Sequence, residues 1–189
     1  MFEKNKKKKT AKPLTKDRLE KAAFLYLERY ASSAENLRRV LMRRVDKSAR
    51  LHGTDPVQGA VWADNLIERL LKSGILDDSV YAAGRANSMH RRGVSGRAIT
   101  MKLSAKGVDT EVIEAALDGL AETIPGDPDM QAAINYAKRR RLGVFRKSDR
   151  PDYRERDLAS LGRQGFSYDI AKKIVDAEDA QMLLDEEGL

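Results

Sequence analysis

Residues that begin and end helices recur along the whole chain. Asp55-Pro56 and Asp127-Pro128 each place a capping Asp before a Pro at the first helical position. Ser32-Ser33-Ala34-Glu35 fits a capping box, in which Ser and Glu side chains bond free amides of the first turn. Further candidates for helix starts are Asp77, Ser95, Asp109 and Ser167. Candidates for the left-handed position just past a helix end are Gly74, Gly107 and Gly165. These signals predict about nine helices, at 15–31, 33–50, 56–73, 78–92, 96–106, 110–120, 128–142, 151–164 and 168–183.

Composition and periodicity both favour an all-α fold. Ala and Leu together number 43, whereas Val, Ile and Thr together number 24, and that balance favours helix over strand. The first predicted helix carries apolar residues at the spacing of one helical face, at Leu19, Ala22, Ala23, Tyr26, Leu27 and Tyr30. No segment alternates apolar and polar residues over a sustained length. We therefore predict a chain built entirely from helices.

A helix–glycine turn–helix pattern occurs twice, 58 residues apart. The segment 103–109 aligns with 161–167, placing Gly107 on Gly165, and further along Val112 falls on Ile170. A weaker echo places Ser33, Leu37 and Leu41 on Ser95, Ile99 and Leu103. The pattern could spell only a common helix C-cap, but its extension into the next helix favours a true repeat. We predict tandem three-helix units that form a curved, elongated array.

The predicted organisation follows from these repeats. Three-helix units are expected at 14–74, 75–124 and 125–183. A Lys-rich tail at 1–13 and an acidic C-terminal end at 184–189 flank them, and both are expected to be disordered.

The net charge is +7, and it is unevenly distributed. Residues 1–56 hold 16 basic and 7 acidic side chains, a net of +9, whereas 57–128 hold 8 and 10, a net of −2. A basic surface attracts polyanions such as nucleic acid or an acidic protein face, although it can also serve solubility alone. No apolar run is long enough to span a membrane, and no apolar segment of a signal peptide follows the first lysines. We expect a cytoplasmic protein with no membrane partner.

The sequence contains no recognisable constellation of catalytic residues. With no Cys and only His52 and His90, the chain cannot build a disulfide, a thiolate nucleophile, a Cys-ligated zinc or a His-rich metal site. Phosphate-binding loops, dinucleotide-binding motifs and metalloprotease or hydrolase signatures are absent. His90 fits a plain helix end, although it could also contact a phosphate. We predict that the protein is not an enzyme and uses no cofactor, metal or small-molecule substrate.

Basic residues cluster near predicted helix ends. The clusters lie at 38–44, at 90–106 around the turn Gly93–Ser95, and at 138–141. Cations in a last turn also complement the helix dipole, so this arrangement has a purely structural explanation. We expect the turn to be exposed. The predicted partner-binding residues are Arg39, Arg43, Arg85, Arg91, Arg92, Arg97, Lys102, Lys106, Arg139 and Arg140.

The stretch from Leu70 to Leu117 resembles the RecX family, the regulators of the RecA recombinase. The residues that carry the resemblance are Leu70, Gly74, Ile75, Leu76, Asp77, Asp78, Tyr81, Ala82, Arg85, Arg92, Gly93, Val94, Ser95, Ile99, Lys102, Leu103, Lys106, Gly107 and Val108. Weaker agreement runs over 14–44 and 133–177. The Lys-rich start, the loop 142–151 and the acidic end look like additions peculiar to this chain.

The resemblance implies an all-helical array of three-helix units without catalytic activity. RecX-like proteins bind in the groove of the RecA filament on single-stranded DNA. There they limit its growth and lower its ATPase, strand-exchange and coprotease activities, which places them in DNA repair, homologous recombination and the SOS response. The resemblance transfers no catalytic residue, so the ten cations above remain predictions of a contact surface.

A second reading is a direct nucleic-acid-binding module with helix-turn-helix-like units. The net negative charge of residues 57–128 argues against it, as does the lack of a helix with Arg, Asn and Gln at base-reading spacing. A third reading is an enzyme with an unrecognised site. Tight binding to bare DNA would favour the second reading, and turnover of a substrate would favour the third.

Overall fold

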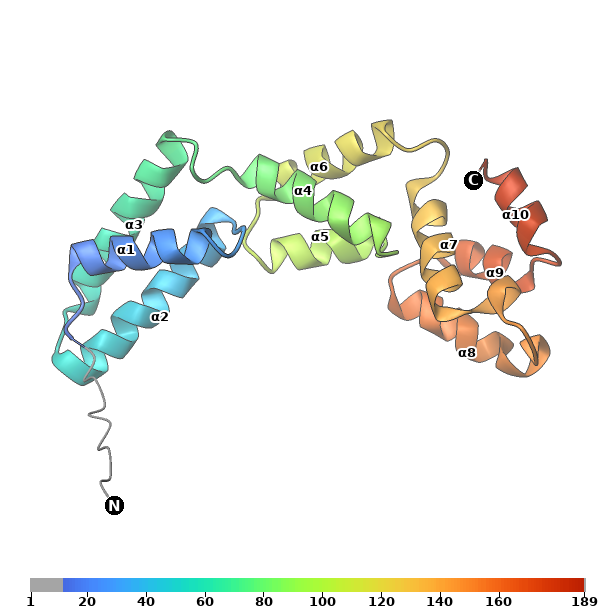
Figure 1. Ribbon diagram of the computed structural model, residues 1–189, viewed down its shortest axis with the longest axis horizontal. Coiled ribbons are helices and arrows are strands. Elements are labelled where there is room, and N and C mark those ends of the chain that lie inside the picture. Colours follow the sequence, from blue (N-terminus) through green and yellow to red (C-terminus); the bar gives the residue numbers. More distant parts are fainter. Residues whose placement is uncertain (1–11, 189) are drawn as a thin grey trace, which may run out of the picture. The chain divides into compact units, whose positions relative to one another are not determined.

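The computed structural model describes residues 12–188, and within that range it is entirely helical (Figure 1). It contains ten α-helices and one short 3-10 helix there, with no strand. The predicted all-α class is therefore confirmed, although the described part of the chain has one helix more than the nine predicted. The predicted disorder of residues 1–13 stays a prediction, because residues 1–11 lie outside the described range. None of the described helices is long and apolar enough to cross a membrane.

The chain divides into two compact units, Met1–Leu76 and Asp77–Leu189. The first unit contains α1 (Lys16–Leu27), α2 (Ala34–His52) and α3 (Pro56–Lys72). Its core is formed by fully or almost fully buried residues from all three helices, Leu19, Ala23, Leu37, Leu41, Val45, Ala63, Leu66 and Leu70. These residues recur three, four or seven positions apart within each helix, which is the spacing of one buried helical face.

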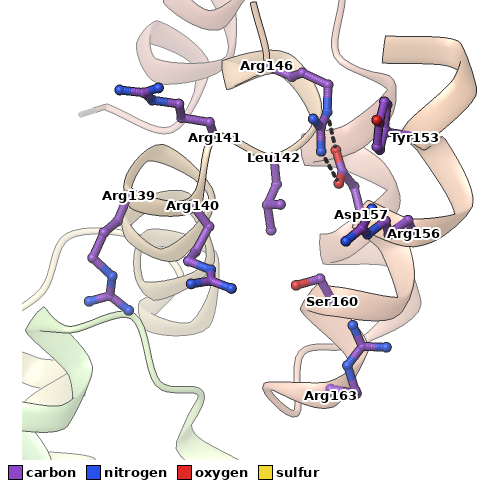
Figure 2. A pocket seen from close by; sticks show the side chains of 10 residues that line it. All are labelled: Arg139, Arg140, Arg141, Leu142, Arg146, Tyr153, Arg156, Asp157, Ser160 and Arg163. Carbon is purple, nitrogen blue, oxygen red and sulfur yellow. Dashed lines mark hydrogen bonds and ion pairs between the residues drawn. The ribbon is translucent and has the colours of Figure 1, made fainter. Parts of the chain in front are cut away.

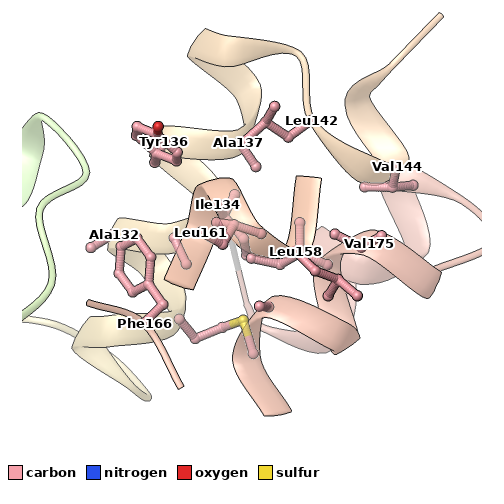
Figure 3. Close-up of a cluster of buried hydrophobic side chains, with 14 of the residues drawn as sticks. Ala132, Ile134, Tyr136, Ala137, Leu142, Val144, Leu158, Leu161, Phe166 and Val175 are labelled. Atoms are coloured by element: carbon pink, nitrogen blue, oxygen red, sulfur yellow. The ribbon is translucent and has the colours of Figure 1, made fainter. Parts of the chain in front are cut away.

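The second unit contains two helical bundles, each with its own hydrophobic core. The first bundle consists of α4 (Asp78–Arg91), α5 (Gly96–Ser104) and α6 (Thr110–Glu122), around Ile99, Leu103 and Ile113. The second bundle surrounds Ile134, Leu161 and Val175 (Figure 3). Its elements are α7 (Pro128–Arg140), η1 (Gly143–Phe145), α8 (Arg150–Arg163), α9 (Tyr168–Asp176) and α10 (Ala180–Glu186). The limits of the three predicted repeats stay a prediction.

The predicted capping residues begin the helices almost as expected. Ser33, Ser95 and Ser167 each accept a hydrogen bond from the amide three residues on, at 3.2, 3.2 and 3.3 Å. Asp55, Asp77 and Asp127 also cap their helices, whereas Asp109 holds the N-cap position without a side-chain bond. The capping box is wrong in register, because α2 begins after Ser33 and Glu35 is its second residue rather than its third.

The glycine turns also match the predicted repeat. Gly107 and Gly165 have φ of +74° and +92°, in the left-handed region that glycine adopts at least cost. In both turns the following apolar residue bonds back to a buried leucine, Val108 N to Leu103 O and Phe166 N to Leu161 O. This closes the helix end with the same hydrophobic contact in both bundles.

The C-terminal part of the chain differs from the prediction. The prediction of a single helix at 168–183 is wrong, because α9 ends at Asp176 and α10 starts after Asp179. The Asp179 carboxylate caps α10 by accepting hydrogen bonds from the amides of Gln181 and Met182. The Arg150 guanidinium donates to the carbonyl oxygens of the intervening turn, including Ala177 O and Glu178 O. The end at 184–189 is also not disordered throughout, since α10 continues to Glu186 and anchors itself through buried Leu183.

The two bundles of the second unit are joined by three long-range hydrogen bonds. Ser95 Oγ donates to Gln164 O, Gly96 N donates to Asp129 Oδ1, and His90 Nε2 lies against Pro128 O, each at 2.7 Å. His90 lies in the last turn of α4, as predicted, but its ring is buried against Pro128 O, so it is not placed to contact a phosphate. The bonds fix α5 and the end of α4 against the second bundle.

Candidate polyanion interface

All ten predicted contact residues are exposed, and the helices distribute them over both units. Arg39 and Arg43 lie one turn apart on α2 of the first unit. The second unit carries the other eight. Arg85 and Arg91 are on α4, Arg92 is its C-cap, Arg97 and Lys102 are on α5, Lys106 follows that helix, and Arg139 and Arg140 end α7.

Arg39 and Arg92 each contact a residue one helical turn earlier. Arg39 Nε forms an ion pair with Glu35 Oε1 at 2.8 Å, one turn earlier on α2. Arg92 folds back on Ser88, donating to its carbonyl oxygen at 3.0 Å and to its hydroxyl at 2.8 Å. Exposed pairs of this kind are weak. Both side chains can therefore exchange these partners for a stronger anion at small cost.

The turn between α4 and α5 is not the exposed corner that the sequence suggested. Gly93 and Ser95 are buried against the second bundle, and a Cβ on Gly93 would lie 2.7 Å from Tyr136 N. The prediction failed because it treated the turn as local, whereas the neighbouring bundle covers it. Arg91, Arg92 and Arg97 nevertheless stay exposed around this junction.

A second cationic feature is a cavity of about 520 Å³ between the end of α7, η1 and α8. Figure 2 shows Arg139, Arg140 and Arg141 on one side of it, and Arg156, Ser160 and Arg163 from α8 on the other. We call this feature the arginine cavity. Its lining consists of Arg139, Arg140, Arg141, Leu142, Arg146, Tyr153, Arg156, Asp157, Ser160 and Arg163.

The single carboxylate of the arginine cavity is already neutralised. Asp157, 2% exposed, accepts bonds from Arg146 Nε at 3.1 Å, Arg146 Nη2 at 2.7 Å and Gly143 N at 2.8 Å. This bonding to Asp157 raises the pKa of the Arg146 guanidinium. Arg146 also lies over the Tyr153 ring, 4.2 Å from its centroid. The cation is therefore held from two sides, and its charge is balanced.

The other five guanidiniums of the cavity are not balanced. Within residues 12–188, none of Arg139, Arg140, Arg141, Arg156 and Arg163 takes part in an ion pair. Five unpaired guanidiniums around one concavity produce a strong local positive potential. This part of the surface is suited to an anion that carries several charges.

Sequence reasoning found only part of this cavity. It proposed Arg139 and Arg140 but omitted Arg141, Arg146, Arg156 and Arg163. One signal was available, because residues 156, 160 and 163 are spaced by four and three positions and so share a face of the predicted helix 151–164. Arg146 carried no such signal, since the loop 142–151 had no predicted structure.

Comparisons with known proteins agree with this architecture. The family model described as RecX, second three-helix domain, matches residues 77–117. The chain is 42% identical over 165 residues to the regulatory protein RecX of Myxococcus xanthus (strain DK1622), covering 86% of each chain. It is 31% identical over 154 residues to the regulatory protein RecX of Thermobifida fusca (strain YX), covering 79% of this chain and 80% of that one.

A solved structure shows the same fold. The crystal structure of RecX from Lactobacillus salivarius matches with a TM-score of 0.59 and 20% identity, covering 85% of this chain and 94% of that one. The helical bundles and the relatives together define a class of all-helical regulatory proteins. The chain belongs to the RecX family, and the resemblance seen in the sequence is confirmed.

Proposed function

We propose that this protein binds the RecA recombinase filament on single-stranded DNA and inhibits its recombinase, ATPase and coprotease activities. Membership of the RecX family of regulatory proteins supports this role. It requires no catalytic group, cofactor or small-molecule substrate of its own. With this role, the protein acts in the cytoplasm on the RecA filament. It takes part in the regulation of recombination, DNA repair and the SOS response.

The observation that carries the proposal is the fixed placement of exposed cations on the second unit. Arg91, Arg92 and Arg97 surround a junction at which hydrogen bonds of 2.7 Å tie α4 and α5 to the following bundle. A rigid body loses little conformational freedom on binding, and several weak contacts on it act together. Such a surface suits a long polyanionic partner with a regular structure.

Inhibition then follows from a difference in affinity. A bound protein changes the activity of the filament only if it prefers one state of the filament over another. We propose that the exposed cations contact protein surfaces and nearby DNA phosphates of the filament. In the less active state of the filament, the spacing of these groups matches the spacing of the cations. Charge contributes to the rate of encounter and makes the binding sensitive to salt.

A binding experiment separates this proposal from direct recognition of DNA. The protein is titrated into fluorescent single-stranded DNA, alone and coated with RecA and a non-hydrolysed nucleotide, at equal salt. We expect binding to the coated DNA to be at least roughly tenfold tighter, because only the filament offers protein and phosphate contacts together. Equal or tighter binding to bare DNA would overturn the proposal in favour of a nucleic-acid-binding module.

A further inference from the structure

We propose that the arginine cavity is a binding site for a compact oligophosphate, such as the triphosphate group of a nucleotide or a short inorganic polyphosphate. This site is separate from the junction around Arg91, Arg92 and Arg97, and it does not depend on RecA binding. Its residues all belong to α7, η1, α8 and their connections, within the second bundle of the second unit.

The charges that line the arginine cavity favour a ligand with several negative charges. Six arginines and one carboxylate line the cavity, and the carboxylate is saturated by Arg146 and the Gly143 amide. Guanidinium groups bind phosphate oxygens through paired N–H donors, and they remain charged at every accessible pH. Five unpaired guanidiniums therefore match a ligand that concentrates several negative charges in a small volume.

Part of the cavity is already organised before a ligand binds. Buried Asp157 holds Arg146 through Nε and Nη2, so that Nη1 remains without a bond to this carboxylate. The Tyr153 ring lies against the same guanidinium, and Arg141 is the C-cap of α7 with φ of +55°. A ligand would therefore meet at least one guanidinium, that of Arg146, whose supports are already in place, and this lowers the entropy lost on binding.

The size and lining of the cavity favour phosphate groups over a nucleotide base. The cavity volume of about 520 Å³ lies in the range of small-molecule sites, about 300–1,000 Å³. Base recognition usually needs an open aromatic face, but Arg146 and Arg156 both lie over the Tyr153 ring, at 4.2 and 5.8 Å. Leu142 is the one aliphatic side chain in the lining. The site is therefore built for phosphate groups rather than for a base.

The test measures binding of defined phosphate compounds to the full chain by calorimetry and thermal shift. The probes are sodium tripolyphosphate, metal-free ATP, orthophosphate and a short deoxythymidine oligonucleotide, at matched ionic strength and without RecA. We expect tripolyphosphate and ATP to bind one per chain with similar affinity and to raise the melting temperature by mass action. Orthophosphate should bind roughly tenfold more weakly or worse, because it engages fewer guanidiniums.

Variants locate the site. The double change Arg140→Glu and Arg156→Glu should weaken tripolyphosphate binding by roughly tenfold or more, since each removes charge-assisted bonds and adds repulsion. Arg163→Gln provides a milder second variant at an exposed position on the last turn of α8. The matched control, Arg85→Glu with Lys102→Glu, reverses two exposed cations on α4 and α5. It should leave tripolyphosphate binding unchanged, even where it weakens filament binding.

Three results would overturn the proposal. Tripolyphosphate and ATP could fail to bind, or they could bind the cavity variants as tightly as the original protein. The oligonucleotide could bind more tightly than tripolyphosphate through Arg140 and Arg156, which would make the cavity a site for a nucleic acid strand. None of these results depends on whether the protein inhibits RecA.

Discussion

Ser95 Oγ donates a 2.7 Å hydrogen bond to the carbonyl oxygen of Gln164, which lies 69 residues further along the chain. Ser95 Oγ also accepts a hydrogen bond from the amide of Ala98, at 3.2 Å, and so caps α5. One buried hydroxyl thus begins a helix in one bundle and satisfies the end of a helix in the next. The local cap was predictable from the sequence, but the long-range bond was not.

Replacing Ser95 with Ala removes both bonds. We expect a loss of about 2–3 kcal/mol in the free energy of unfolding, combining a lost cap with a buried carbonyl that loses its partner. Ser167→Ala is the matched control, because Ser167 is exposed and only caps α9; it should cost about 1 kcal/mol. Urea denaturation measures both values. Equal losses would mean that the bond to Gln164 contributes nothing to stability.

Gly93→Ala tests the close approach between the α4–α5 turn and α7. A Cβ there would lie 2.7 Å from Tyr136 N and 2.8 Å from Ala132 O, which are backbone atoms that cannot move away easily. Gly126 has a similar φ, +77° against +70°, but nothing lies within 4 Å of its added Cβ. Gly126→Ala should cost about 1–2 kcal/mol from conformation alone. Gly93→Ala should cost clearly more, because steric overlap adds to the same strain.

Thermal or urea unfolding of these two glycine variants measures the difference. The comparison is sharp because both positions share the left-handed conformation, and only one of them faces another bundle. If both variants lose the same free energy, the two bundles do not pack as closely as the structure indicates.

Asp157 connects η1, α8 and the arginine cavity. We expect Asp157→Ala to cost about 3–5 kcal/mol, because it leaves the Gly143 amide and the partly buried Arg146 guanidinium without their acceptor. Asp152→Ala, an exposed residue in the first turn of the same helix, should cost under about 1 kcal/mol. Chemical denaturation of both variants measures this. Similar small losses in both would show that the buried ion pair does not stabilise this bundle.

The sequence predicted local features well and tertiary ones poorly. Helix starts at Ser33, Ser95 and Ser167 and the turn at Gly165 depend on a few adjacent residues, so their patterns are readable. The break between α9 and α10 was missed, because the Arg150 bonds that support it come from a helix more than twenty residues earlier. The burial of the Gly93 turn was missed for the same reason.

The candidate site divides in the same way. Arg139 and Arg140 stood out because they lie in a run of basic residues. Arg156 and Arg163 are separated in sequence from that run, and only the packing of α8 against α7 brings them to one cavity. Arg146 is positioned by Asp157, eleven residues away, through a bond that no local pattern announces.

The ion pair between Arg154 and Asp176 makes stability depend on pH in acid. Hydrogen bonding to Arg154 lowers the pKa of Asp176 below its ordinary value of 3.8. The stabilisation is therefore present above that value and is lost as the pH falls through the lower pKa of the folded state. Arg154→Gln should reduce stability only slightly near neutral pH, since the pair is partly exposed.

Unfolding free energies of the original protein and the Arg154→Gln variant, measured from about pH 7 down to about pH 2, follow this contribution. The difference between the two proteins should shrink in the acid range as Asp176 becomes protonated. A difference that stays constant across the range would assign the effect of the substitution to packing rather than to the ion pair.

The most direct test of the central claim is the ATPase activity of RecA on single-stranded DNA, with this protein titrated in. We predict that the original protein inhibits it, and that reversing Arg91, Arg92 and Arg97 to Glu raises the half-inhibitory concentration by roughly tenfold or more, because like charges then face the filament. The control Lys21→Glu, Lys47→Glu and Arg50→Glu reverses three exposed cations of the first unit and should inhibit like the original protein. An ATPase rate that the original protein leaves unchanged would contradict the proposed function, and full inhibition by the folded Arg91, Arg92 and Arg97 variant would contradict the assigned surface.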